Sequence, residues 1–255
     1  MNEEYLISTL SKVNGVDPAD LSLFGSEENQ IRALMNVTMP FDLPPEFYRK
    51  QDEYLKDRLS REKVIDVSLL PGRISLYRGD ITLLKADAIV NAGNSALLGC
   101  FVPLHSCIDN AIHSKAGLEV RRDLMQVMSR QGHEEENGKV KVTQGYNLPS
   151  AWIFHTVGPQ VRGSVTSQDE EDLRSCYLSC LKEADRRNVK SLVFPCLSTG
   201  LFDYPIEPAS LLAVMTVKNY LEKTGSNLHV VFDVFSPRDE SVYRNVFRSL
   251  RISYR

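Results

Sequence analysis

The chain has 255 residues, of which 42% are hydrophobic and 25% are charged, the composition of an ordinary globular protein. Thirty basic and 33 acidic residues give a formal net charge of −3 at pH 7. No chain-wide positive field therefore attracts nucleic acid or an anionic membrane, and an anionic ligand must be held by local geometry. Five cysteines occur without an N-terminal apolar run or an 18-residue apolar span, so we expect a reduced, cytoplasmic protein.

The first 72 residues carry the acidity. They hold 8 Lys/Arg and 13 Asp/Glu, a net charge of −5, whereas residues 73–255 hold 22 and 20, a net charge of +2. Leu6, Leu10 and Val13 recur at helical spacing, and a second helical pattern follows Pro44-Pro45. About 70 residues bury too little apolar surface to be stable alone. We therefore expect residues 1–72 to form a helical extension packed on the rest of the chain.

From Pro71-Gly72 onward, strand-like and helix-like segments alternate. Strands are predicted at 74–78, 86–90, 140–143, 151–157, 191–195 and 228–235, and helices at about 108–130, 170–188, 207–222 and 239–249. This alternation predicts an α/β sandwich around a mixed, mostly buried sheet.

Familiar nucleotide-binding motifs are absent from the sequence. There is no G-x-G-x-x-G. The stretch from Gly132 to Gly138-Lys139 differs from a phosphate loop because five residues intervene, three of them glutamates, and Val140 replaces the required Ser/Thr. We exclude both the dinucleotide-binding and the kinase-type NTPase interpretations.

Two loops of small and polar residues follow predicted strands. The strand at 191–195 runs into Cys196-Leu197-Ser198-Thr199-Gly200-Leu201-Phe202, where several backbone N–H groups can turn inward and hold phosphate oxygens. The strand ending at Val90 runs into Asn91-Ala92-Gly93-Asn94-Ser95, whose carboxamides can reach sugar hydroxyls. Taken alone, the first of these loops is more simply explained as an ordinary strand-to-helix turn. Two of them at one sheet edge indicate a ligand with both phosphate and sugar.

A compact C-x₄-H-x-C pattern follows the second loop. Cys100, His105 and Cys107 are the ligand types that zinc prefers, and three protein ligands leave a fourth position for water or substrate. The alternative is that both cysteines are buried small hydrophobic residues and that His105 is a loop residue.

Two aspartates lie close to these segments. Asp109 stands at the start of a predicted helix, where it either caps the helix or, beside an open metal position, orients a water or takes a proton. Asp80 ends the first strand, as a turn residue or as an acceptor for an exocyclic amine. His113 and His155 are predicted to be packing residues without chemistry.

Together these segments resemble the macrodomain family of ADP-ribose-binding modules over residues 73–250. The resemblance rests on Gly79-Asp80-Ile81, Asn91-Ala92-Gly93-Asn94-Ser95, Ile108-Asp109-Asn110-Ala111-Ile112-His113 with Ala116-Gly117, Thr143-Gln144-Gly145-Tyr146-Asn147-Leu148-Pro149, Phe154-His155-Thr156-Val157-Gly158-Pro159 and Phe194-Pro195-Cys196-Leu197-Ser198-Thr199-Gly200. It implies a three-layer α/β/α macrodomain at 73–255 with a mixed central sheet, preceded by the helical extension at 1–72.

The subfamily follows from the residues before Asp109. Most hydrolytic macrodomains have a run of glycines there, and this chain has Cys100, His105 and Cys107. It therefore resembles the zinc-dependent macrodomains, whose members also have a helical N-terminal extension. The resemblance implies Zn²⁺ as cofactor, either lowering the pKa of a water or positioning the substrate, with Asn94 and Asp109 as catalytic residues.

The resemblance also assigns the ADP-ribose pocket. Asp80 would hold the adenine amine with the Ile81 backbone beside it, and Asn94 would contact the distal ribose. Backbone amides of four residues would hold the diphosphate: Ser198, Thr199, Gly200 and Leu201. Phe202 would lie against the distal ribose, while Cys107, Ile108 and Asp109 border the same pocket. Many members have glycine after this aromatic residue, whereas this chain has Asp203.

The implied activity is hydrolysis of mono-ADP-ribose from protein side chains. Bacterial relatives are associated with a macrodomain-linked sirtuin that modifies a lipoyl carrier protein, so this carrier is a candidate substrate and the sirtuin a functional partner. Neither nucleic acid nor membrane is an expected partner. The alternatives are a reader that binds ADP-ribose without cleaving it and a deacetylase that acts on O-acetyl-ADP-ribose in the same pocket.

Overall fold

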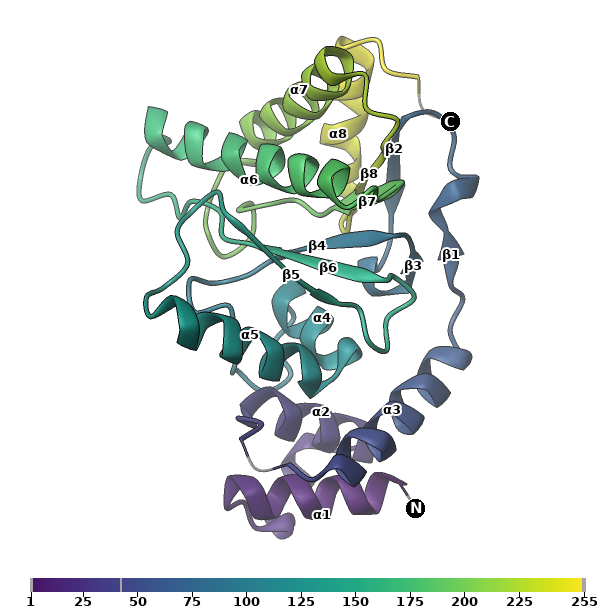
Figure 1. Cartoon of the computed structure of the whole chain (residues 1–255), viewed down its shortest axis with the longest axis vertical. Coiled ribbons are helices and arrows are strands. Elements are labelled where there is room, and N and C mark those ends of the chain that lie inside the picture. Colours follow the sequence, from purple (N-terminus) through teal and green to yellow (C-terminus); the bar gives the residue numbers. More distant parts are fainter. Residues whose placement is uncertain (1, 42, 254–255) are drawn as a thin grey trace.

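A mixed sheet of six strands forms the centre of the computed structural model, which describes residues 2–41 and 43–253 (Figure 1). The strand order is β2-β8-β7-β4-β6-β5. The strands are β2 (Ile74–Arg78), β4 (Ala88–Ala92), β5 (Val140–Gln144), β6 (Trp152–Thr156), β7 (Ser191–Phe194) and β8 (His229–Val234). Only β5, at one edge, runs antiparallel to its neighbour β6. The expected mixed sheet is confirmed.

Helices cover both faces of this sheet (Figure 1). Helices α6 (Ser167–Arg186), α7 (Ile206–Thr224) and α8 (Pro237–Ser249) lie on one face, and α4 (Ile108–Ala116) and α5 (Leu118–Gln131) lie on the other. Each face has its own apolar core. Because the central strands are buried on both faces, their sequences read as continuous apolar runs, which explains why strands were predictable there.

The single helix predicted over 108–130 is wrong, because the structure has two helices separated by Gly117. This glycine has a φ of +106°, which ends α4. A Cβ atom at this position would lie 2.6 Å from Nε2 of Gln51 and 2.7 Å from Oε2 of Glu119. The break therefore makes room for a side chain that comes from the N-terminal extension.

The N-terminal extension consists of three helices, α1 (Asn2–Asn14), α2 (Glu27–Val37) and α3 (Pro45–Ser60), with a 3₁₀ helix at Pro18–Phe24. They lie beyond α4 and α5, at the bottom of Figure 1. Their apolar side chains, Leu6 and Leu10 among them, form a separate cluster with Leu118 of α5, whereas Val13 is exposed. Helix α3 begins at Pro45, as the two prolines predicted.

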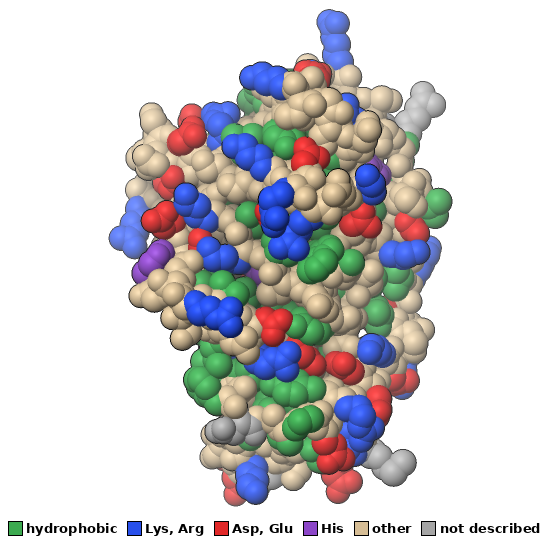
Figure 2. All heavy atoms as spheres, in the orientation of Figure 1, with side chains coloured by type: hydrophobic (Ala, Val, Ile, Leu, Met, Phe, Trp, Pro, Cys, Tyr) green, Lys and Arg blue, Asp and Glu red, His purple; other side chains and the backbone are tan. Residues whose placement is uncertain are grey.

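A short segment connects this extension to the sheet. Its strand β1 (Ile65–Asp66) pairs in parallel with β3 (Leu84–Lys85), and short 3₁₀ helices occupy Val67–Leu69 and Ile81–Leu83. No helix in the described ranges is long and apolar enough to cross a membrane. Basic and acidic side chains interleave over the face shown in Figure 2.

Buried polar contacts fix the extension to α5. Gln51 of α3 accepts a hydrogen bond from the backbone N–H of Leu118 at 2.9 Å and donates one to Glu119 at 2.7 Å. Both side chains are buried. Burial raises the pKa of Glu119 from 4.5 to about 7, because few groups replace the water that would stabilise its charge.

This carboxyl group makes stability depend on pH. Its folded pKa lies above its unfolded value, so its favourable contribution is present below about pH 4.5 and is lost as the pH rises towards 7. We expect Glu119→Gln to keep the Gln51 contact and to reduce the fall in unfolding free energy between pH 5 and 8 by about 1–3 kcal/mol. Urea unfolding of both proteins at both pH values tests this. An equal fall in the two proteins would contradict it.

Candidate active site

Three loops meet at the carboxyl ends of the parallel strands. Strands β4 and β7 are hydrogen-bonded neighbours, so the loops that follow them leave from one edge of the sheet. Strands β2 and β8 end at the same edge, where the backbone N–H of Gly79 donates to the carbonyl of Val234 at 3.1 Å. The topology thus brings together the three segments that the sequence had marked separately.

The loop after β7 is a tight turn with unpaired backbone amides. Ser198 has a φ of +63°, and its carbonyl accepts from the backbone N–H of Tyr204 at 3.0 Å. Within the described ranges, the backbone N–H groups of Thr199, Gly200 and Leu201 donate to no protein acceptor. Consecutive unpaired N–H groups of this kind can bind an anion without any lysine, so diphosphate binding by this loop stays a prediction.

Two details show how tightly this loop is built. The Ser198 hydroxyl is buried without a hydrogen-bond partner among the described residues. A Cβ atom added to Gly158 would lie only 2.1 Å from this hydroxyl oxygen. Asp203 has a φ of +55° and is exposed. The left-handed backbone explains why glycine suits the position after Phe202, and why aspartate is tolerated there.

Asp80 and Ile81 lie at the other end of this edge. One oxygen of Asp80 accepts from the backbone N–H and the hydroxyl of Thr82, at 2.9 and 2.6 Å, so this aspartate caps a 3₁₀ helix. The carboxylate is exposed, and its second oxygen is available to an amine. Phe235, which the sequence analysis did not select, follows Val234 and is 79% exposed. An exposed aromatic ring at this sheet edge can stack on a planar base.

The Asn94 side chain bonds within its own loop. Its amide donates to the carbonyl of Gly99 at 3.2 Å, and its oxygen accepts from the backbone N–H of Ala96 at 3.1 Å. Asn94 is half-buried at the same sheet edge. Contact with a distal ribose stays a prediction for this residue.

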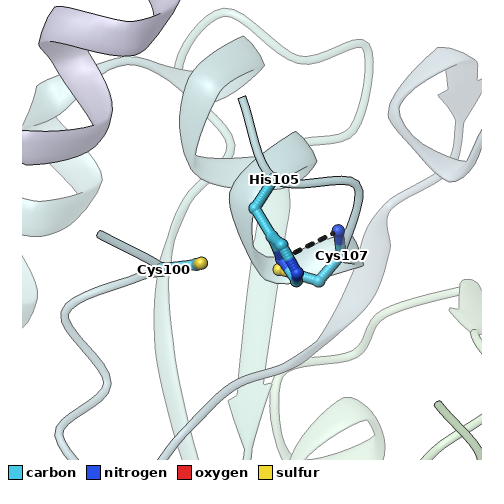
Figure 3. A group of neighbouring side chains, drawn as sticks. All are labelled: Cys100, His105 and Cys107. Carbon is cyan, nitrogen blue, oxygen red and sulfur yellow. Dashed lines mark hydrogen bonds between the residues drawn. The ribbon is translucent and has the colours of Figure 1, made fainter. Parts of the chain in front are cut away.

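Cys100, His105 and Cys107 form a cluster at the start of α4. One ligand atom from each side chain lies within 4.8 Å of the other two, and Figure 3 shows the side chains gathered in one place. Both cysteines are free thiols and all three residues are half-buried. Burial and the neighbouring Cys100 raise the pKa of Cys107, so without a cation the thiol form is favoured.

The donor set fits a zinc ion. Zinc–sulfur and zinc–nitrogen bonds are about 2.3 and 2.0 Å long, so ligands of one tetrahedral ion stand roughly 3.5–3.8 Å apart, inside the observed limit. Two sulfurs and one imidazole nitrogen are also donors that favour zinc over harder cations. Three protein ligands would leave a fourth coordination position for water or substrate.

Asp109 is buried, although most aspartates at a helix start are exposed. Its Oδ1 accepts from the Asn91 amide at 2.8 Å, and Nε2 of His113 lies 3.5 Å away. Burial raises the pKa of Asp109 to about 6, partly offset by the Asn91 hydrogen bond and the charge of Arg121. Ile108, one residue earlier, is half-buried beside the cluster.

Polar residues behind Asp109 extend this network into the core. Nδ1 of His155 lies 3.2 Å from the Asn91 amide, and its Nε2 lies 2.8 Å from the hydroxyl of Thr143. Burial lowers the pKa of His155 to about 3 and that of His113 well below its usual value, so both are neutral. Both histidines are buried, as the sequence predicted, but the sequence did not reveal that His113 lies beside Asp109 and His155 beside its partner Asn91. The available signal was an asparagine and a histidine inside apolar strands.

Comparison with known proteins identifies this arrangement. The model of the Macro domain matches residues 90–213. A protein of Staphylococcus aureus strain MRSA252, named protein-ADP-ribose hydrolase, is 46% identical over 221 residues, which are 85% of this chain and 83% of that protein. The chain belongs to the macrodomain family.

Two further comparisons extend the result for this macrodomain. A protein-ADP-ribose hydrolase of Treponema medium is 41% identical over 253 residues and covers 95% of both chains, the N-terminal extension included. The solved structure of the Oceanobacillus iheyensis macrodomain with ADP is 34% identical, with a TM-score of 0.63 over 69% of this chain and 90% of that one. The expected three-layer fold is thereby confirmed.

Proposed function

We propose that this macrodomain is a zinc-dependent hydrolase that removes mono-ADP-ribose from modified protein side chains. The observation that carries the proposal is the position of the Cys100, His105 and Cys107 cluster, which immediately precedes Asp109 at the sheet edge. A module that only binds ADP-ribose has no need of an open metal site beside a buried carboxylate. The names of the two curated relatives, protein-ADP-ribose hydrolase, support the same activity.

The ligand would lie along the sheet edge. The second carboxylate oxygen of Asp80 would accept from the adenine amine, with Phe235 placed to stack on the base. The unpaired amides of Thr199, Gly200 and Leu201 would hold the diphosphate. This use of backbone amides suits a chain with no surplus of basic residues.

The distal ribose would then lie against Asp109. Hydrolysis adds water to the anomeric carbon, breaks its bond to the protein side chain, and returns a proton to the departing atom. The Asn91 amide holds Oδ1 of Asp109, which leaves Oδ2 to orient that water and accept its proton. A zinc ion held by Cys100, His105 and Cys107 would supply a Lewis acid that polarises or orients oxygen atoms at this end of the cleft.

The substrate protein is also a proposal. We propose a lipoyl carrier protein modified by a macrodomain-linked sirtuin, in a reduced cytoplasm; the five free thiols of the chain agree with that compartment. An O-acetyl-ADP-ribose deacetylase would use the same pocket. The two activities separate in one assay, because only the hydrolase releases ADP-ribose from protein.

Removing one metal ligand tests the role of the cluster. We expect Cys107→Ala to lose bound zinc and at least 100-fold in release of ADP-ribose from the sirtuin-modified carrier, because two ligands hold zinc poorly. Cys180→Ala, a buried thiol far from the cluster, is the matched control and should keep both zinc and activity. Zinc content is measured by mass spectrometry, and turnover with and without chelator.

Three results would contradict the proposal. A metal-free Cys107→Ala protein with full turnover would exclude a role for zinc. A wild-type protein that binds ADP-ribose but releases no label from the carrier would favour the reader. Release of acetate from O-acetyl-ADP-ribose with no action on the carrier would favour the deacetylase.

A second prediction concerns the diphosphate loop. A Cβ at Gly158 would stand 2.1 Å from the Ser198 hydroxyl, so Gly158→Ala should displace the loop and weaken ADP-ribose binding at least tenfold, about 1.4 kcal/mol. In Gly158→Ala/Ser198→Ala the clash is relieved to 3.4 Å, the distance to the Ser198 Cβ, and much of the affinity should return. Titration calorimetry with ADP-ribose measures both. Unchanged affinity in the single variant would show that this loop does not hold the ligand.

A further inference from the structure

Helix α2 of the N-terminal extension contacts the loop that carries the cysteine and histidine cluster. The Arg32 guanidinium donates to the backbone carbonyl of His105 at 2.9 Å and to the Asn110 side chain at 2.8 and 3.2 Å. These partners lie more than 70 residues later in the chain. One arginine thus joins a candidate ligand to the first turn of α4.

Asn110, the partner of Arg32, organises the rest of this loop. It is fully buried, and its amide donates to the carbonyl of Val102 at 3.0 Å. Its backbone N–H donates to Sγ of Cys107 at 3.4 Å. Arg32 therefore holds the side chain of a residue that contacts the loop at two places, one of them a candidate ligand atom.

Asn36, one turn further along α2, holds a strained residue of the loop. Leu104 has a φ of +57°, which non-glycine residues rarely adopt, and it directly precedes His105. Its backbone N–H donates to the Asn36 oxygen at 3.0 Å, while the Asn36 amide donates to the Ser114 hydroxyl at 2.9 Å. Asn36 is buried, so this backbone conformation depends on a side chain from the extension.

The beginning of the loop is tied to the same helix. The buried Arg121 of α5 donates to the carbonyl of Leu98 at 2.6 Å and to the carbonyls of Met35 and Thr38 at 2.9 and 2.6 Å. Met35 lies in α2 and Thr38 ends it. Both ends of the loop that carries the three candidate ligands are therefore fastened to α2.

We propose that α2 is a positioning element for the metal site, in which Arg32 and Asn36 hold the loop from Leu98 to Cys107 in the shape that binds the ion. This inference rests on the metal site of the proposed function. It gives the extension a role beyond covering apolar surface, because outer groups that orient ligands commonly change metal affinity 10- to 100-fold. The extension and the site then act as one unit.

Metal titration of the full chain tests this proposal. Co²⁺ is added to the metal-free protein and followed by its thiolate charge-transfer and d–d absorption, with Zn²⁺ competition for affinity. We expect Arg32→Gln to bind Co²⁺ 10- to 100-fold more weakly, with an altered d–d spectrum. Arg32→Lys keeps one donor nitrogen, so its Co²⁺ affinity should lie between those of wild type and Arg32→Gln. This variant also tests the proposal if Arg32→Gln folds poorly.

Gln51→Ala provides the matched control. It removes a buried contact of the same extension with α5, away from the loop, so it should lower the melting temperature while leaving Co²⁺ affinity within twofold of wild type. Arg32→Gln affinity within twofold of wild type would overturn the proposal, as would an equal loss in Gln51→Ala. Wild-type protein with no thiolate band would instead refute the metal site itself and this inference with it.

Discussion

The parallel alignment of five neighbouring strands determines where chemistry can occur in this molecule. Because β2, β8, β7, β4 and β6 run in one direction, the segments that follow them leave from a single edge. Those segments carry the candidate site residues, whereas the central strands are buried on both faces and carry the apolar core. The fold thereby separates stability, held by the strand interiors, from ligand binding, placed at their ends.

The same edge is where the core stops being apolar. Asn91, His155 and Asp109 are buried polar residues here, and hydrogen bonds link Asn91 to both of the others. A carboxylate in this setting has a raised pKa, about 6 for Asp109, and is a better proton acceptor near neutrality than an exposed one. His113 and His155 stay neutral, so they add no positive charge that would lower the pKa of Asp109.

Much of this could be predicted from local patterns. The strands were found because buried runs such as Leu192 to Phe194 are continuously apolar, and the cluster was found because Cys100, His105 and Cys107 lie within eight consecutive residues. Both signals lie within short windows of sequence. The loop after β7 was likewise visible in the run from Ser198 to Gly200.

What the sequence could not reveal depends on distant contacts. The helix over 108–130 appeared continuous because Gly117 reads as a tolerated helical glycine until Gln51, 66 positions earlier, is placed against it. The link between Arg32 and His105 spans 73 positions, and helix α2 itself was not predicted. No local pattern encodes such pairs, which arise only when the extension docks on the domain.

The central proposal is that one edge of the sheet binds both the metal ion and ADP-ribose. A crystal structure of the zinc-loaded protein with ADP-ribose, with anomalous data at the zinc edge, tests this directly. We predict an anomalous peak between Cys100, His105 and Cys107, with the diphosphate on the amides of Thr199 to Leu201 and the distal ribose between the peak and Asp109. A peak elsewhere, or ADP-ribose bound away from this edge, would contradict it.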